Sequence, residues 1–177
     1  MGRASVKEDK NIYQQYREEC GLTRVQASEI MEWISDNRIE KIEGDRTVAT
    51  PEEIMAMSKA YKKPELCNYY CTHECAIGKK LIPEVQSKPI EKIVLEMIAT
   101  LNNLEKQKDR LIEIASDGII HDDEISDFIE ISRQLDKIDN AVESLRLWMD
   151  KTVQSGEINT ELLKKIVGEK GAKNLNL

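Results

Sequence analysis

The sequence predicts an all-α protein in which a module of five short helices precedes a long antiparallel helical hairpin. The first observation is composition: of 177 residues, 33% are charged and 40% are hydrophobic, with one Phe, eight Gly and four Pro. Such a chain is rich in helix formers and poor in the residues typical of β-sheets and turns. The other two observations are apolar residues that recur at steps of three and four, and capping residues that precede them.

The pattern along the chain divides it into three parts. Residues 1–64 alternate short helical patterns with breaks, which predicts a small helical domain. Residues 65–88 form a connector that contains three cysteines. Residues 89–177 contain long amphipathic patterns, which predict the helical hairpin as a domain for dimerisation or for contact with a partner.

The first two helices are predicted from the residues at their ends. Gly21 suits the C-terminal end of one helix, because a residue without a Cβ adopts the left-handed conformation easily. Thr23 then caps a second helix, and Gln26 stands three residues later, as in a capping box. Leu22 lies between the two helices and is expected to anchor them in the core.

Two more short helices follow in the N-terminal part. One begins after Ser35 and ends at Gly44. The next begins at Thr50 and Pro51, because Thr caps a helix and Pro suits its first turn. We expect the inner sides of these two helices to consist of Ile39, Ile42, Ile54, Met57, Ser58 and Tyr61.

Two long amphipathic patterns occupy the C-terminal part, with Pro89 at the start of the first and Gly118 in the break between them. The first pattern consists of Ile90, Ile93, Val94, Met97, Ile98, Leu101, Leu104, Leu111, Ile112 and Ala115. The second consists of Ile125, Phe128, Ile129, Ser132, Leu135, Ile138, Val142, Leu145 and Met149. Such long stripes exceed what one hairpin can bury, so we expect a homodimer. The alternative is a self-contained hairpin that is covered by a terminal helix after residues 155–156.

Two short motifs occur together in the N-terminal part. Arg-Glu-x-x-Gly-Leu-Thr spans residues 17–23, and Ile-x-x-Ile-Glu-Gly spans residues 39–44. With these motifs, residues 12–64 resemble the phage-repressor (Xre-type) helix-turn-helix family. The resemblance implies a compact all-α bundle whose third helix enters the major groove of DNA. It implies further that the protein is a sequence-specific transcriptional regulator that binds an operator in double-stranded DNA, and the apolar stripes of the C-terminal part add the expectation of a dimer.

The resemblance also implies which residues contact DNA. They are Asp36, Asn37 and Lys41 on the third helix, where family members meet base edges, with Arg38 beside them, and Arg24 and Arg46, where family members bind phosphate. The chain departs from the family at residues 32–34, where the turn is bulkier and one residue longer than the usual Gly-containing turn. Asp36 and Glu40 repel phosphate, and residues 1–66 hold 11 basic and 13 acidic side chains. These departures leave open a protein-interaction adaptor that has the same bundle without affinity for DNA.

The connector contains a cluster of possible soft-metal ligands. Cys67, Cys71 and Cys75 follow a C-x3-C-x3-C spacing, and His73 lies inside it. Zinc or an iron–sulfur cluster accepts such ligands, and a metal- or redox-responsive regulator is therefore a further alternative. On a continuous helix, however, Cys67 and Cys75 lie about 12 Å apart along the axis, too far to share one zinc ion. The other interpretation is that these thiols pack the connector against the bundle, and we expect Cys20 to be a small buried hydrophobe.

Other functions have little support in the sequence. Residues 113–124 place Gly118 and Glu124 as in a calcium-binding EF-hand, but Ala115 stands where an oxygen ligand is needed, so a helix–turn–helix junction explains them. We expect His121 to be an exposed turn residue there. No phosphate-binding loop or catalytic grouping indicates an enzyme.

The composition also bears on location and on non-specific binding. No stretch reaches the roughly 18 apolar residues of a membrane span, and the N-terminus lacks the apolar core of a signal peptide. We therefore expect a cytoplasmic protein without membrane contact. The formal net charge of −7 argues against non-specific coating of nucleic acid, although it leaves a local DNA-reading surface open.

Overall fold

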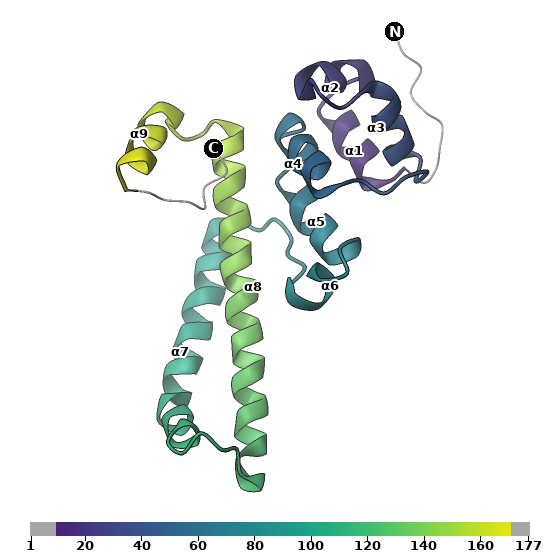
Figure 1. The fold of residues 1–177 in the computed structure, drawn as a ribbon. Coiled ribbons are helices and arrows are strands. Elements are labelled where there is room, and N and C mark those ends of the chain that lie inside the picture. Colours follow the sequence, from purple (N-terminus) through teal and green to yellow (C-terminus); the bar gives the residue numbers. More distant parts are fainter. Residues whose placement is uncertain (1–9, 171–177) are drawn as a thin grey trace. The chain divides into compact units, whose positions relative to one another are not determined.

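The computed structural model describes residues 10–170, and every regular element in that range is helical (Figure 1). The all-α prediction is therefore confirmed for this range. The elements are α1 (Ile12–Glu19), α2 (Arg24–Met31), α3 (Asp36–Glu43), α4 (Pro51–Ala60), α5 (Glu65–His73), α6 (Gly78–Leu81), α7 (Ile90–Ala115), the 3-10 turn η1 (Asp122–Glu124), α8 (Ile125–Ser155) and α9 (Thr160–Lys170). Residues 1–9 and 171–177, at the outer ends of the predicted domains, lie outside the described range. None of the described helices is both long and apolar enough to cross a membrane.

The chain forms two compact units. The first combines Met1–Ile82 with Asp150–Leu177, and the second is Pro83–Met149. The predicted connector, residues 65–88, is helical in its first part, where α5 and α6 belong to the first unit. The side chain of Leu66 in α5 is fully buried in the same core as α1–α4, which explains why this segment packs with the bundle.

The core of the first unit is built from one side of each short helix. Its buried members are Tyr13, Ala27, Met31, Ile34, Ile39, Ile42, Ala49, Ile54, Met57, Tyr61 and Leu66. The inner sides predicted for α3 and α4 are confirmed, and Ser58 is buried with them. Leu22 is partly buried against this core. The Tyr13 hydroxyl of α1 donates a 2.5 Å hydrogen bond to Oε1 of Glu74, the residue after α5. This bond connects α1 with the C-terminal end of α5.

The predicted caps are present. The Thr23 hydroxyl accepts from the Gln26 backbone N–H, and the Gln26 side chain accepts from the Thr23 N–H at 2.9 Å, which completes a capping box. Thr50 and Glu53 form the same reciprocal pair at the start of α4. Because each box satisfies amide groups that the first helical turn leaves unpaired, the two helices begin where the sequence predicts.

The turn between α2 and α3 has an unusual backbone. Glu32 ends α2 with φ 60° and ψ −47°, a region that favours glycine. Trp33 follows with 61% of its surface exposed, and Ile34 returns to the core with 1% exposed. The bulky turn that the sequence shows is therefore accommodated by a strained glutamate and an outward-facing tryptophan.

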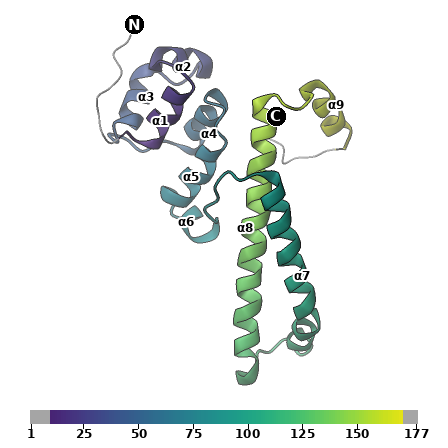
Figure 2. The ribbon, with the colours of Figure 1, turned by 180° about the vertical axis from the view of Figure 1, so that it is seen from behind.

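In the second unit, α7 and the first part of α8 lie side by side and run in opposite directions (Figures 1 and 2). Gly118 turns the chain between them with φ 71°, and Arg110 Nε donates to Asp127 Oδ2 at 2.7 Å. Ile93 of the predicted stripe is buried, but Leu101 is half exposed and Thr100 is buried beside it. The apolar stripe predicted on α7 is therefore wider than the strip of α7 that contacts α8. The contact uses one edge of the stripe and leaves the rest exposed.

Candidate nucleic-acid interface

The exposed side of α3 is the surface to which the sequence assigns base contacts. Ile39 and Ile42 anchor α3 in the core, so the opposite side faces solvent. Asp36, Asn37 and Lys41 are all exposed there, and Asn37 and Lys41 lie four residues apart, one turn along the helix. The Ser35 hydroxyl caps α3, and an Asp36 carboxylate oxygen accepts the Asn37 N–H at 2.9 Å. The structure thus brings three predicted residues onto one accessible surface.

A buried ion cluster holds α1, α2 and α3 together beneath that surface. The Glu43 side chain is fully buried and accepts from Arg17 Nε at 2.5 Å and from Arg17 Nη2 at 2.9 Å. Arg24 Nε donates to the same carboxylate at 2.7 Å. Arg17 also donates to the Leu22 carbonyl at 2.6 Å, which fixes the chain between α1 and α2. Arg24 is half exposed, so it supports the fold and also faces solvent at the start of α2.

Arg38, which the resemblance places among the DNA contacts, hydrogen bonds within the protein in this structure. Its Nε and Nη2 atoms donate to the two carboxylate oxygens of Glu53 at 2.6 and 2.8 Å. Its remaining bonds go to the Thr47 hydroxyl at 2.7 Å and to the Val48 carbonyl at 3.0 Å. The hydrogen bonds from Arg38 lower the pKa of Glu53. The guanidinium therefore joins α3, α4 and the loop between them, and in this conformation it does not extend toward the exposed side of α3.

Arg46 lies in the loop after α3, where the sequence assigns a phosphate contact. Its guanidinium forms an ion pair with Glu40, and both side chains are largely exposed. This hydrogen bond lowers the pKa of Glu40. An exposed ion pair of this kind is weak and exchanges readily with solvent or with another anion. Arg46 can therefore leave Glu40 for a phosphate at small cost.

The thiols of the connector and His73 are not gathered around one point in the described structure. In the part of the chain that the structure describes, no group of three or more His, Cys, Asp or Glu side chains is placed to hold a metal ion. Cys67 and Cys71 lie on α5, whereas Cys75 follows the end of that helix and accepts from the Gly78 N–H at 3.4 Å. The His73 ring stacks on Tyr69 with 4.3 Å between ring centres. The arrangement therefore gives no support to zinc or an iron–sulfur cluster.

The cysteines have structural surroundings. Burial raises the pKa of the Cys67 thiol, and Ser58 hydrogen bonds with it. Gly78 packs so closely on the Cys71 backbone that an added Cβ would lie 2.2 Å from the Cys71 carbonyl oxygen. The expectation that Cys20 is buried is wrong: the residue is exposed, because it ends α1 at the surface, and its thiol donates to the Tyr61 carbonyl.

The junction between α7 and α8 is explained by helix ends. His121 is exposed, as expected, and its Nε2 lies 2.9 Å from Asp117 Oδ2, a contact that raises the pKa of His121. A Glu124 side-chain oxygen accepts from the His121 backbone N–H at 3.0 Å, as in a capping box. Glu124 thus caps the turn at residues 122–124, and Asp117 pairs with His121. This part of the described chain holds no group suited to a metal ion.

The sequence did not predict the buried contact of Arg17 with Glu43 or the partly buried contact of Arg38 with Glu53. Glu43 follows the buried Ile42 in the motif at residues 39–44, and a charged residue in such a position signals a paired side chain. Arg17 stands in the companion motif, so the two motifs contain both partners of one ion pair. Nothing local indicates that Arg38 pairs with Glu53, because fifteen residues separate them.

No protein-family model matches this chain, and no curated protein or solved structure matches it. A functional assignment therefore depends on the residues described above.

Proposed function

We propose that the first unit binds double-stranded DNA, with α3 as its recognition helix, and that the protein is a dimeric transcriptional regulator related to the phage-repressor helix-turn-helix proteins. The observation that carries this proposal is the exposed pair Asn37 and Lys41, one turn apart on the solvent side of a helix that Ile39 and Ile42 hold in place. A helix presented in this way fits the width of the major groove.

The chemistry of the exposed pair suits base recognition. An Asn amide can bond both N6 and N7 of adenine, and a Lys ammonium can reach O6 and N7 of guanine. Arg24 at the start of α2 and Arg46 after α3 supply positive charge on either side, in positions suited to phosphates. We assign Arg38 to positioning, because its bonds to Glu53, Thr47 and Val48 hold α3 against α4.

The acidic residues on α3 bear on specificity. Asp36 and Glu40 oppose the phosphate backbone and lower the affinity for arbitrary DNA. An Asp36 carboxylate can accept a hydrogen bond from the amino group of cytosine, which offsets its repulsion of phosphate at a cognate sequence. The proposal therefore predicts weak non-specific binding together with measurable discrimination among sequences.

Selection from a pool of random duplexes tests this function. Purified full-length protein at about 50 mM salt should enrich one short half-site, repeated about one helical turn away if the protein binds as a dimer. Repeating the selection with Asn37→Ala should relax the preference at one position and leave the others unchanged. A wild-type pool without any enriched sequence would contradict the proposal.

An adaptor that binds protein instead of DNA is the second candidate. It is favoured by Trp33, whose large apolar ring is 61% exposed in the turn before α3. Tryptophan is frequent among residues that dominate protein interfaces. Failure to enrich any duplex, together with intact folding by circular dichroism, would favour this candidate.

A further inference from the structure

The second unit buries apolar and polar side chains of α7 and α8 together. The buried apolar ones are Ile93, Ile114, Ile131, Ala141 and Leu147. Thr100, Gln134 and Ser144 are buried there. The Oε1 atoms of Gln107 and Gln134 are buried without a hydrogen-bond partner in the described part of the chain. A buried polar atom without a partner costs free energy, so these two amide oxygens offset part of the stability that the buried apolar side chains provide.

Many further apolar side chains of the two helices remain exposed beside the seam between them. Those at least 38% exposed include Val94, Leu101 and Leu111 on α7 and Phe128, Leu135 and Met149 on α8. Met97, Leu104, Val142 and Leu145 lie among them and are partly buried. We call these ten residues the apolar face.

Helical geometry places the apolar face on one side of the second unit. On α7, Val94 and Leu101 directly follow the buried Ile93 and Thr100. On α8, Leu135 directly follows the buried Gln134, and Val142 follows Ala141 in the same way. One residue is a rotation of about 100° in a fixed sense. Because the two helices are antiparallel, the same rotation on each brings both rows to the same side of the pair.

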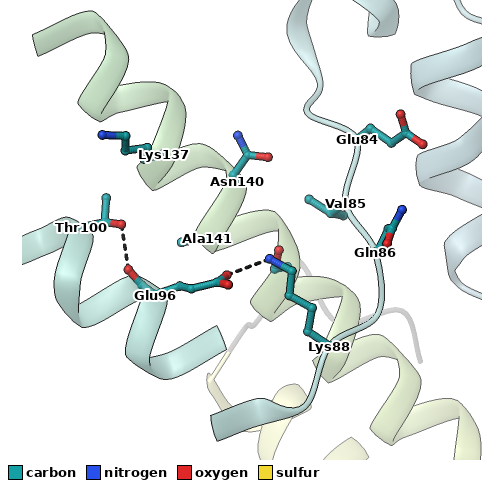
Figure 3. Close-up of a pocket in the computed structure, with 10 residues that line it drawn as sticks. Glu84, Val85, Gln86, Lys88, Glu96, Thr100, Lys137, Asn140 and Ala141 are labelled. Atoms are coloured by element: carbon teal, nitrogen blue, oxygen red, sulfur yellow. Dashed lines mark hydrogen bonds and ion pairs between the residues drawn. The ribbon is translucent and has the colours of Figure 1, made fainter. Parts of the chain in front are cut away.

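The opposite side of the pair is polar and already covered. Residues 84–88 run across it and, with both helices, enclose a pocket of about 540 Å³ (Figure 3). Lys88 forms a 2.8 Å ion pair with Glu96 on its wall, and Lys137 and Asn140 line it from α8. Asn140 directly precedes the buried Ala141, whereas Val142 on the apolar face directly follows it. The pocket and the apolar face therefore lie on opposite sides of α8. Residues 84–88 leave the apolar face uncovered.

We propose that a second copy of this chain docks on the apolar face, so that two helical pairs form a four-helix bundle. The row Phe128, Leu135, Val142 and Met149 repeats every seven residues, which is the spacing of a helix seam packed against another helix. The row carries no charge, so a two-fold axis can place it against its own copy without opposing like charges.

The size of the apolar face also fits a second copy. Ten apolar side chains at roughly 60 Å² each, with a polar rim, approach the roughly 800 Å² per partner of a standard specific interface. The bundle would bury apolar side chains that the α7–α8 contact leaves exposed, as core positions of four-helix bundles do. The inference rests on the second unit alone and does not depend on DNA binding.

Analytical ultracentrifugation of the full chain without DNA tests the proposal. The wild-type chain of 20.3 kDa should sediment at twice that mass at tens of micromolar. The double variant Leu101→Glu, Leu135→Glu should sediment as a monomer with an unchanged helical circular dichroism signal, because both side chains are half exposed within one copy.

The matched control is Leu95→Glu, which changes a leucine that is 68% exposed on α7 but faces away from the apolar face. This variant should remain dimeric. A monomeric wild-type chain, or equal dissociation of the control and the double variant, would overturn the proposal. A monomeric wild-type chain would remove the repeat of the half-site from the expected duplex selection, whereas enrichment of a single half-site would still report on α3.

Discussion

Glu32 occupies a backbone conformation that a glycine adopts at much lower cost. With φ 60° and ψ −47°, its backbone lies in a region that L residues rarely populate, because their Cβ is crowded there. The resemblance to repressor-like proteins leads one to expect glycine in this turn, and the chain has none at residues 32–34. The turn therefore keeps its shape because Met31 and Ile34 are both buried and fix the backbone on either side of Glu32.

Replacing Glu32 by Gly should stabilise the first unit. Relief of strain is worth roughly 1–3 kcal/mol, and the added flexibility of glycine in the unfolded chain costs about 0.5–1 kcal/mol, so we expect a gain of about 1 kcal/mol. Urea unfolding followed by circular dichroism measures the change. Gly21→Ala, at φ 70°, is the control and should lose about 1 kcal/mol. A destabilised Glu32→Gly variant would show that the turn is not strained.

Tyr61 carries a buried hydroxyl with no hydrogen-bond partner among the described residues. Burial raises the pKa of this phenol above its ordinary value of 10.0. Above about pH 10 the unfolded chain loses the phenolic proton while the folded chain keeps it. The free energy of unfolding should therefore fall as pH rises from about 10 toward the folded pKa.

Tyr61→Phe tests this assignment in both pH ranges. At pH 7 the free energy of unfolding should stay equal or rise by up to about 1 kcal/mol, because no hydrogen bond is lost. Its decline above pH 10 should be smaller than in the wild type. Tyr13→Phe loses the bond to Glu74 and should cost about 1 kcal/mol at pH 7. If Tyr61→Phe costs as much as Tyr13→Phe, the Tyr61 hydroxyl has a partner.

At the scale of helices, Glu43 is the residue on which α1, α2 and α3 converge. Its carboxylate accepts from both Arg17 and Arg24, and its side chain is fully buried. Removing one partner of a buried ion pair leaves the other charge without compensation. The ion cluster is therefore expected to determine whether α3 holds its position.

We expect Glu43→Ala to destabilise the first unit by about 3–5 kcal/mol. Glu40→Ala is the matched control, since it makes the same change on α3 to an exposed carboxylate whose partner is Arg46. The control should unfold at nearly the wild-type urea concentration, because an exposed ion pair contributes little. Equal stability of the two variants would mean that the Glu43 cluster does not hold the helices together.

Local signals predicted the ends of the short helices. Thr23 with Gln26, and Thr50 with Glu53, needed only neighbours within one turn, so the sequence was sufficient. The partner of Arg38 and the exposure of Cys20 depend on how the helices meet, which no local pattern contains. On the candidate interface, the exposure of Asn37 and Lys41 was predictable, because helical periodicity turns them to solvent once Ile39 and Ile42 are buried.

The seam of the second unit shows a different limit of sequence reasoning. The apolar stripe on α7 is wide enough for more than one helix partner, and hydrophobicity alone does not reveal which edge faces α8. The structure buries Ile93 and Thr100 there and leaves Val94 and Leu101 uncovered. Because α8 covers only part of the apolar stripe on α7, the rest of the stripe is available to a second copy of the chain.

For the whole molecule, the proposed function combines a DNA-binding unit with a dimerising unit. Two recognition helices related by a two-fold axis would read half-sites about 34 Å apart. The net charge of −7 means that affinity cannot come from general attraction to DNA. Binding should therefore depend strongly on the few residues that face the groove.

The most direct measurement compares Lys41→Ala with Lys59→Ala on the duplex that the selection enriches. Both residues are exposed lysines of the first unit, on α3 and α4 respectively, so each change removes one positive charge. Loss of a base contact costs about 1–3 kcal/mol, so Lys41→Ala should weaken binding about tenfold or more, whereas Lys59→Ala should change the Kd less than twofold. Equal Kd values for the two variants would contradict the assignment of α3 as the recognition helix.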